Sequence, residues 1–410
     1  MIPVWKKVGR SLFWLFLIGI TFATGMFQSG FVAWFLFYIV VALALYEFLT
    51  ARNALRVSTS ERKLSSRKLS AGQSLDVDIF VHVDGRWPLP WLVIEDTLPT
   101  RLLLQSGTNR DLHFPGYNRK LRLSYSLPNM PRGKYTLGDT YLVTGDIFGL
   151  FKKEVVHARH DEVTVYPKVV PIKFWHTVNK FNTGNSYAQN RMSEDSTNVI
   201  GVRDYVAGDR LSRIHWAATA RTGTMKSKEF ELHVTNDLMF MLNRSEEAYL
   251  GGSSQLFEMA VITCASLAKY AVGKKYSVGL VSYGRERLTI PQNRSLEQYM
   301  RIIEHLAIVQ PDSRDDFQEV ILREANYLSR GSTVVLITPA VDDKLVSLAG
   351  FLDYRKIKTE LFYITGGRPV SPDDQARIGK MSLFGVHTYI VRDENELDDV
   401  VRGPAYATNS

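Results

Sequence analysis

The chain has 410 residues, of which 45% are hydrophobic and 22% are charged, and these values are ordinary for a protein with folded globular domains. Its net charge is +8, but no nucleic-acid-recognition motif accompanies the basic residues, so we expect no nucleic-acid partner. Cys264 is the only cysteine, which excludes a disulfide framework and a cysteine metal site, and its apolar surroundings in the sequence are typical of a core residue.

Two apolar runs at the start of the chain predict a transmembrane hairpin. They span residues 11–27 and 31–49, each close to the roughly 20 residues with which an α-helix crosses a bilayer. No Lys or Arg lies in the turn at 28–30, whereas both outer ends are basic: Lys6, Lys7 and Arg10 before the first run, and Arg52, Arg56, Arg62, Lys63, Arg67 and Lys68 after the second. The positive-inside rule therefore predicts a multi-pass protein of the inner or plasma membrane, anchored through residues 1–54 with the bulk of the chain cytoplasmic.

Two other interpretations of these runs stay open. The first run could be the apolar part of a secretory signal peptide with small residues near 22–25, although the second run would still anchor the product. The two runs could also form a buried helix pair in a soluble protein. Beside a membrane, the basic cluster in residues 52–68 would most simply meet anionic lipid head groups.

Residues 55–172 carry the pattern of a β-sandwich. Short stretches alternate between apolar and polar residues, and turn residues separate them. These stretches are residues 75–83, 91–96, 120–127, 140–144 and 162–166. Several short strands with frequent turns predict an antiparallel, immunoglobulin-like sandwich that serves as a spacer or binding module.

Two phrases in this region combine glycine with aromatic residues. They are PRGKYTLG at residues 131–138 and GDIFGLF at residues 145–151. Glycine permits the turn that opens the first phrase and the bend in the second. We expect the following side chains to face the interior of the sandwich: Tyr135 and Leu137 from the first phrase, and Phe148, Leu150 and Phe151 from the second, where they would close its bottom.

The segment 173–236 contains the most informative stretch, GVRDYVAGDRLSRIHWAATARTGTMKSKEF. Guanidinium groups pair bidentately with carboxylates and stack on indole rings, so we expect a rigid polar cluster, packed against Trp216, that links the next domain to the sandwich. Asp209 should cap a short helix that carries Arg213, His215 and Trp216. The candidate binding or structural residues are Arg203, Asp204, Tyr205, Gly208, Asp209, Arg213, His215, Trp216, Arg221 and Glu229.

The phrases RDYVAGDRLSRIHWAATARTG and KEFE resemble the signature of the domain of unknown function 58 family. RGKYTLG, GDIFGLF and VTVYPKVVPI resemble the stretch that precedes this signature in the family, so the resemblance covers nearly the whole chain. It implies a membrane-anchored protein with a β-sandwich and a von Willebrand factor A-like α/β domain. The partners that it implies are a MoxR-type AAA+ ATPase and a transglutaminase-like membrane protein, and it implies no reaction.

The pattern of residues 237–402 predicts an α/β domain, and residues 403–410 follow it as a tail. We expect apolar strands at 238–242, 276–283, 287–290, 333–338, 360–364 and 386–391, and helices at 256–271, 296–308 and 317–328. Apolar strands that alternate with helices indicate a mostly parallel sheet covered on both faces. This pattern fits the von Willebrand factor A-like fold that the resemblance implies.

The metal site of that fold is degenerate in this sequence. The fold often holds Mg²⁺ through an Asp-x-Ser-x-Ser loop, a Thr and a further Asp, because hard divalent cations prefer oxygen ligands with negative charge. Here the first loop is residues 243–247, the second at 312–316 lacks Thr, and Pro339 stands near the expected Asp. We expect neither a metal nor a cofactor at the degenerate candidate set, Asn243, Ser245, Glu247 and Thr338, next to the positive charge of Arg244.

No catalytic motif is present in the sequence, since both a Gly-x-Ser-x-Gly elbow and a phosphate-binding P-loop are missing. The leading interpretation is a membrane-tethered, non-enzymatic scaffold or adaptor that partners a MoxR-type ATPase in a cell-envelope or assembly process. One alternative is an enzyme of unrecognised type that uses Asp209, His215 and Glu229, and another is a lipid-binding surface module. An open pocket around these residues would favour the enzyme, and their burial in a closed network would favour the scaffold.

Overall fold

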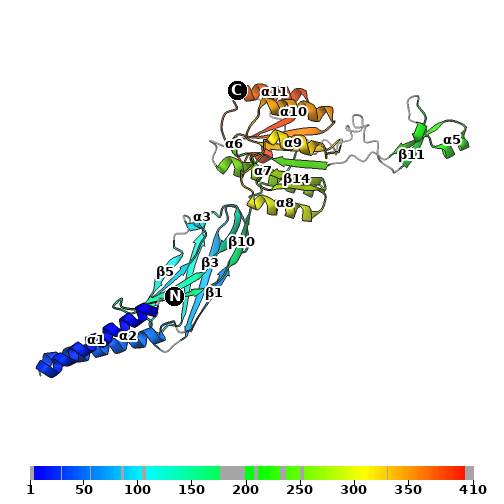
Figure 1. The fold of residues 1–410 in the computed structure, drawn as a ribbon. Helices are drawn as coiled ribbons and strands as arrows, with labels where there is room; N and C mark the ends of the chain where they lie inside the picture. Colours follow the sequence, from blue (N-terminus) through cyan, green and yellow to red (C-terminus); the bar gives the residue numbers. More distant parts are fainter. Residues whose placement is uncertain are drawn as a thin grey trace. The chain divides into compact units, whose positions relative to one another are not determined.

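The computed structural model describes residues 4–28, 30–55, 57–84, 87–103, 108–175, 199–206, 211–230, 237–249, 254–329 and 331–401. The chain divides into two compact units, residues 1–166 and 167–410. The first unit holds a helical hairpin and a β domain, and the second holds an α/β domain and a small module around residues 199–230 (Figure 1). The predicted tail 403–410 and, within the signature, Gly208 and Asp209 lie outside the described residues.

The chain begins with two helices that pack against each other as a hairpin, α1 (Val4–Gln28) and α2 (Phe31–Asn53). Aromatic rings from both helices meet near the turn. Toward the other end, the indole N–H of Trp14 donates a hydrogen bond to the carboxylate of Glu47. This bond ties the two helices together at the end of the hairpin away from the turn.

The outward faces of this hairpin are apolar and exposed, as on Phe27 and Phe31, which are 90% and 84% exposed. By length and composition, two described helices could cross a membrane: α2, and α7 (Ser254–Gly273) of the second unit. The second of these is largely buried in its own domain, which is typical of a core helix. The apolar part of α1, Leu12–Gln28, is shorter than the roughly 20 residues with which a helix usually crosses a bilayer.

The β domain of the first unit consists of three sheets (Figure 1). Its elements are β1 (Val57–Leu64), β2 (Lys68–Ser70), β3 (Leu75–Asp84), β4 (Leu92–Asp96), α3 (Thr100–Leu103), β5 (Arg110–His113), β6 (Lys120–Leu127), β7 (Gly133–Leu137), β8 (Thr140–Gly145), β9 (Lys152–His157) and β10 (Asp161–Tyr166). The sheet orders are β1-β3-β6, β2-β10-β7 and β5-β4-β8-β9. Paired strands are antiparallel except β10 and β2, which run parallel.

Alternation along the strands places one face of each main strand in a common core. The inward residues of β3 and β4 are buried together with residues from β6 to β8 and α3: Leu75, Ile79, Leu92, Ile94, Leu102 and Leu127 are all fully buried. Every strand predicted from alternation is present. The strands β1, β5 and β9 were not predicted, because their sequences VSTSERKL, RDLH and KKEVVH have few apolar residues at alternate positions.

The two glycine-rich phrases differ in how well they match expectation. Both residues predicted to face inward in the first phrase are buried, Tyr135 and Leu137. In the second phrase Phe151 is buried, but Phe148 and Leu150 are 59% and 50% exposed, so the prediction that they close the bottom of the domain is wrong. The reason is a turn at Asp146, whose carboxylate accepts the backbone N–H groups of Phe148 and Phe151, so that the side chains of Phe148 and Leu150 lie outside the core.

The α/β domain of the second unit is built on a six-stranded sheet. Its strands are β13 (Asp237–Leu242), β14 (Ser277–Tyr283), β15 (Arg287–Asn293), β16 (Thr333–Thr338), β17 (Lys358–Ile364) and β18 (His387–Val391), in the order β15-β14-β13-β16-β17-β18. Only the pair β14 and β15 is antiparallel among the described pairs of this sheet. The central strands are buried along their whole length, which explains their nearly continuous apolar sequences.

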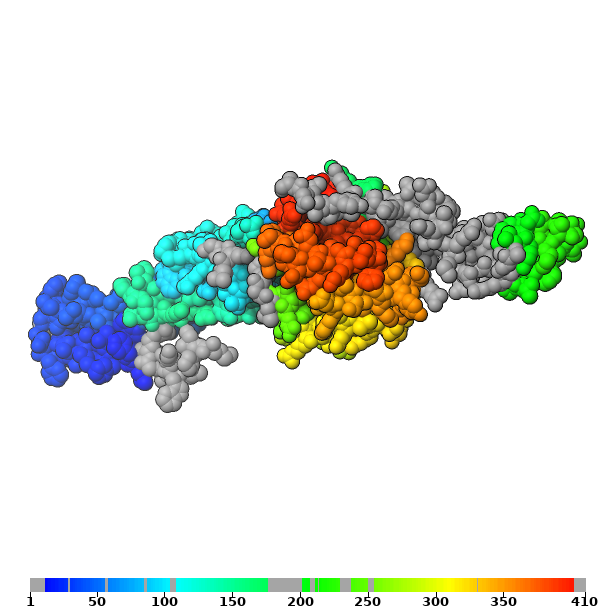
Figure 2. All heavy atoms as spheres, turned by 90° about the horizontal axis from the view of Figure 1, so that it is seen from above, coloured from blue at the N-terminus to red at the C-terminus, as the bar shows by residue number. Residues whose placement is uncertain are grey.

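Helices cover this sheet. They are α6 (Glu246–Tyr249), α7, α8 (Leu296–Ile308), α9 (Phe317–Ala325), α10 (Asp343–Tyr354), α11 (Pro372–Leu383) and α12 (Leu397–Val400). The orange and red helices α10 and α11 lie side by side on the surface of the domain (Figures 1 and 2). Cys264 is fully buried in α7, as predicted for a core residue, and burial raises the pKa of its thiol.

The residues that follow β10 form a strap, residues 167–175, that belongs to the second unit. Trp175 at the end of the strap is fully buried, its indole N–H donates to Glu360 Oε2 at 2.9 Å, and its ring lies 5.9 Å from that of Phe362. The two units therefore divide after Tyr166, which is earlier than the predicted boundary at residue 172.

Candidate functional site

The signature forms a small module of two strands and one short helix. Its described elements are β11 (Val199–Asp204), the 3₁₀ turn η2 (Leu211–Arg213), α5 (Trp216–Thr222) and β12 (Lys226–Phe230). The strands pair antiparallel, with Asp204 opposite Lys226. Ile214 and Ser227, which face each other across an isolated bridge, are buried.

His215 holds the start of the helix in this module. Its Nδ1 accepts the backbone N–H of Ala218 at 3.1 Å, and the backbone N–H of His215 donates to the carbonyl of Lys226 at 2.8 Å. The helix therefore begins at Trp216, as predicted for that residue, whereas the prediction that it also carries Arg213 and His215 is wrong, because Arg213 lies in η2 and His215 is the N-cap. The imidazole supplies the acceptor that an N-terminal cap requires, and this gives His215 a structural role.

The described charged residues of the module lie at its surface. Asp204 accepts a hydrogen bond from Lys226 Nζ at 2.5 Å while its own side chain is 78% exposed. Arg203 and Arg221 are exposed, and Trp216 is 65% exposed. These residues therefore do not form a closed, buried network, because a two-stranded ribbon with a two-turn helix has too little apolar material to enclose arginines. Tyr205 is half-buried.

Exposed apolar side chains accompany these charges. Beside Trp216, the module exposes Val202, Val206, Leu211 and Met225, each between 43% and 69% exposed. We call these five residues, with Arg203 and Arg221, the signature surface. Tryptophan and arginine are residues that protein–protein hot spots favour, and the exposed aliphatic side chains of the same module add apolar surface.

A cavity lies elsewhere in the second unit. It measures about 430 Å³ and is bounded by the strap and α7, with Lys173, Lys269 and Lys274 at its walls. His215 does not line it, nor does any Asp or Glu. The cavity therefore gives no support to acid–base chemistry by the signature residues.

The degenerate metal loop is closed by its own side chains. Asn243 Oδ1 accepts the N–H of Ser245 at 2.8 Å, and its Nδ2 donates to Thr338 Oγ1 at 3.0 Å. The structure thus brings three of the four predicted residues together. The fourth, Glu247, is exposed on α6.

Arg244 is the residue that decides the chemistry of this loop. Its side chain is 6% exposed, and it donates to the carbonyl of Gln310 at 2.9 Å, to Ser282 Oγ at 3.2 Å and to Asp312 Oδ1 at 2.5 Å. Gly284 lies against this pair, and a Cβ at that position would collide with the guanidinium and the carboxylate. The buried guanidinium of Arg244 already neutralises the carboxylate of Asp312. A divalent cation at this loop would therefore be repelled by Arg244 and would find neutral side chains as ligands.

We expect no saturable Mg²⁺ binding at this loop. Among the described residues, no group of three or more His, Cys, Asp or Glu side chains lies close enough to hold a metal ion. Isothermal titration of the detergent-solubilised chain with Mg²⁺ checks this. Micromolar binding that Ser245→Ala abolishes would contradict it.

A second prediction concerns His305, which lies in α8 near Arg244. Burial, and next the positive charge of Arg244, lower the pKa of His305 from 6.5 to about 4. The folded state keeps this imidazole neutral, so between these two pH values the unfolded chain binds more protons than the folded chain. The free energy of unfolding should therefore fall as the pH is lowered through this window.

Urea unfolding of the full chain and of His305→Gln, at several pH values between 7 and about 4, measures this effect. We expect the variant to lose less stability on acidification than the parent. His160→Gln, at an exposed histidine, serves as the control and should behave like the parent. Equal pH dependence of all three proteins would contradict the assignment to His305.

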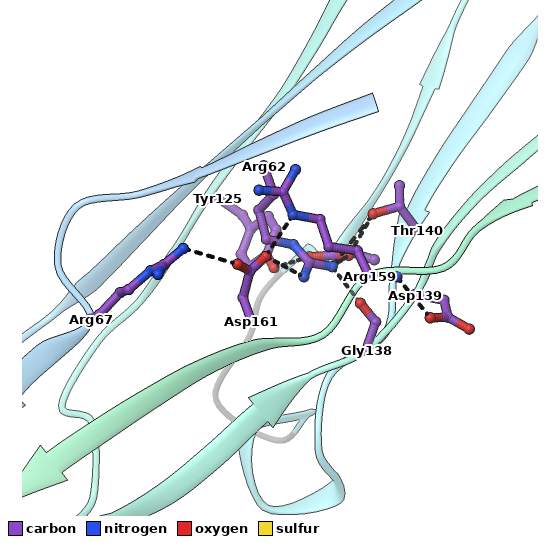
Figure 3. A network of polar contacts seen from close by, with 9 residues as sticks. Arg62, Arg67, Tyr125, Gly138, Asp139, Thr140, Arg159 and Asp161 are labelled. Carbon is purple, nitrogen blue, oxygen red and sulfur yellow. Dashed lines mark hydrogen bonds and ion pairs between the residues drawn. The ribbon is translucent and has the colours of Figure 1, made fainter. Parts of the chain in front are cut away.

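The β domain contains a buried ionic network that was not predicted (Figure 3). Arg62 of β1 is 4% exposed and pairs with two carboxylates, Asp96 of β4 and, at 3.2 Å, Asp161 of β10. It also donates to the carbonyl of Gly138 at 2.6 Å. Tyr125 donates its hydroxyl to Asp96 at 2.5 Å. The network thus joins four strands and the loop after β7.

The two carboxylates of this network differ in their surroundings. Asp161 also accepts from Arg159 at 3.0 Å and from Arg67 at 3.4 Å, and both of these arginines reach the surface (Figure 3). Asp96 is fully buried, so Arg62 is the charge that compensates it. Burial, reinforced by the Asp96 charge, raises the pKa of Tyr125, which keeps the hydroxyl protonated as a donor.

Together, the fold and the signature define an α/β protein with an apolar N-terminal helical hairpin, a β domain and an exposed arginine- and tryptophan-bearing module. Residues 201–360 match the model of the family described as "Protein of unknown function DUF58". The uncharacterized protein YeaD of Bacillus subtilis (strain 168) is 30% identical over 352 residues, which are 84% of this chain and 85% of that protein. The chain belongs to the DUF58 family.

Distant likenesses to solved structures accompany this assignment. A von Willebrand factor type A protein from Catenulispora acidiphila is 9% identical, with a TM-score of 0.30 over 43% of this chain and 42% of that chain. The PilB minor pilin from Streptococcus sanguinis is 10% identical, with a TM-score of 0.31 over 77% of this chain and 86% of that chain.

Proposed function

We propose that this protein is a membrane-tethered, non-enzymatic adaptor that binds a partner through the signature surface. The observation that carries the proposal is the exposure of Trp216 on a module whose histidine is used as a helix cap. A large aromatic side chain that is 65% exposed gains most when a partner covers it. An enzyme that used His215 would need the imidazole beside a cavity that admits a substrate.

The architecture that we propose has three parts. The apolar hairpin α1–α2 crosses the cytoplasmic membrane twice and leaves the rest of the chain in the cytoplasm. The β domain is an immunoglobulin-like sandwich, supported by its antiparallel sheets with alternating burial. The α/β domain is von Willebrand factor A-like with a mostly parallel sheet, supported by the parallel pairs around β13, β16 and β17.

The partner that we propose is a MoxR-type AAA+ ATPase, and a transglutaminase-like membrane protein is a further candidate. The resemblance of the signature to its family supports this choice. The exposed Arg203 and Arg221 of the signature surface also bear on it, because guanidinium groups can pair bidentately with carboxylates of a partner.

Replacing Trp216 by alanine should weaken binding of the purified ATPase by about 30-fold, which corresponds to the roughly 2 kcal/mol of a hot-spot side chain. The melting temperature should stay unchanged, because the side chain is exposed. Biolayer interferometry with the full chain in nanodiscs measures the affinity.

The matched control for this experiment is Tyr354→Ala, which removes an aromatic ring that is 84% exposed on α10. It should bind like the parent. Equal affinities of the parent and Trp216→Ala would overturn the signature surface as the docking site. No binding by any of the three proteins would overturn the ATPase as the partner.

A further inference from the structure

Among the described residues, polar and aromatic contacts join one end of the β domain to the end of α2. The Trp87 indole donates to Thr50 Oγ1 at 3.0 Å, and Lys153 Nζ donates to the carbonyl of Ala54 at 2.6 Å. The ring of Phe148 lies edge-on to that of Tyr46, with centroids 6.1 Å apart. The loop that carries Phe148, residues 146–151, therefore lies beside the last turns of α2.

This loop is held in one conformation by buried groups. Asp146 is 1% exposed, and its carboxylate accepts the N–H of Phe148 at 3.0 Å and of Phe151 at 2.6 Å. The Trp91 indole donates to the carbonyl of Asp146 at 3.0 Å. Gly149 completes the turn with φ of 72°, a conformation that favours glycine. The loop is thus a rigid support.

The side chains on this support are apolar and point outward. Ile147 is 70% exposed, Phe148 59% and Leu150 50%. A neighbouring loop exposes Phe114 and Tyr117, at 75% and 73%. The two loops belong to the same end of the domain, because Leu92 of β4 pairs with Thr144 just before one loop and with His113 just before the other.

We infer that these two loops enter the interfacial layer of the bilayer that holds the hairpin, as an additional membrane contact of the β domain. This inference rests on the proposed membrane anchoring. Tyr46 lies seven residues before the end of α2 at Asn53, about 10 Å along a helix, so Phe148 reaches the depth of the helix's final turns. Amphipathic aromatic rings favour that depth.

Charge around the loops fits the same surface. Lys152 follows the apolar loop directly and is exposed, Lys120 is exposed soon after the second loop, and Arg52 lies in the last turn of α2. Apolar side chains flanked by basic residues match an anionic lipid interface. The contact would hold the β domain against the bilayer through the hairpin and both loops, which restricts its tilt.

The test places an environment-sensitive label at single cysteines in the full chain, reconstituted in vesicles of phosphatidylcholine and phosphatidylglycerol. Because Cys264 is fully buried, Cys264→Ser removes it for a clean background. The variants are Ile147→Cys in the loop, Thr136→Cys as an exposed control on β7, and Phe22→Cys in the hairpin. We expect blue-shifted emission and quenching by doxyl lipids at positions 147 and 22, with neither at position 136.

The outcomes separate the inference from the proposal on which it rests. Quenching at position 22 with water-like emission at position 147 would overturn the loop contact and leave the anchor standing. Water-like emission at position 22 would overturn the anchor and the loop contact together. A blue shift at position 147 without quenching by lipid would also overturn the inference, because it would indicate that a second copy of the chain covers the loop.

Discussion

Replacement of Arg62 by alanine is expected to lower the free energy of unfolding of the β domain by about 3–5 kcal/mol, the usual cost of breaking a buried ion pair from one side. The variant leaves Asp96 fully buried without its cation, although Tyr125 still donates to it. Asp161 is affected less, because Arg159 remains 3.0 Å away. Hydrogen exchange of peptides from β3 and β6, in the full chain under increasing urea, measures the loss.

The matched control is Arg122→Ala, which breaks an ion pair with Asp78 on the same domain in which the arginine side chain is 57% exposed. Exposed pairs contribute about 1 kcal/mol or less, so this variant should stay close to the parent. In the Arg62→Ala background, Asp96→Asn should recover part of the loss because it removes the uncompensated charge. Equal stabilities of Arg62→Ala and Arg122→Ala would contradict the account of the network.

Trp175→Ala is the second variant with a large expected effect. It should destabilise the α/β domain by about 3–5 kcal/mol, because it removes a fully buried indole from a closely packed core. Trp175→Phe keeps most of the ring but removes the donor to Glu360 on β17, and should cost about 1–3 kcal/mol. Thermal unfolding of the full chain, with hydrogen exchange of β17 peptides as the local measure, distinguishes the three proteins.

Phe174 provides the control for this prediction, because it is the adjacent aromatic residue and is 42% exposed. Phe174→Ala should cost much less than Trp175→Ala. Similar losses for both variants would show that the strap contributes through general packing, and the specific role given to Trp175 would be wrong. The strap follows the β domain in the sequence, and Trp175 anchors it in the core of the second unit.

Local pattern determined most of the secondary structure. Residues 120–127, 296–308 and 333–338 were predicted at the bounds that β6, α8 and β16 show. These segments have strong periodicity, because one face of the strand or helix must be apolar to meet the core, and β16 is apolar throughout because both faces are covered. The polar strands β1 and β9 were missed, because few of their residues face the core and alternation carries little signal there.

The signature residues could be found from sequence, but their environment could not. The stretch from Arg203 to Arg221 stands out by its composition, whereas the use of His215 as a helix cap depends on where β12 returns beside it. Likewise, GDIFGLF contains four large apolar residues after Asp146, and only the hydrogen bonds of its carboxylate decide which of them is buried.

By itself, the sequence determined the apolar hairpin, the order of the strands and helices along the chain, the family signature and the loss of the carboxylates from the metal loop. The tertiary structure decided the polar networks. Arg62 and Asp161 are 99 residues apart in sequence, and Arg244 and Asp312 are 68 apart. No local pattern marks such partners, because a buried charge is compensated by whichever groups the fold places around it, and this depends on the packing of whole sheets rather than on neighbours in the chain.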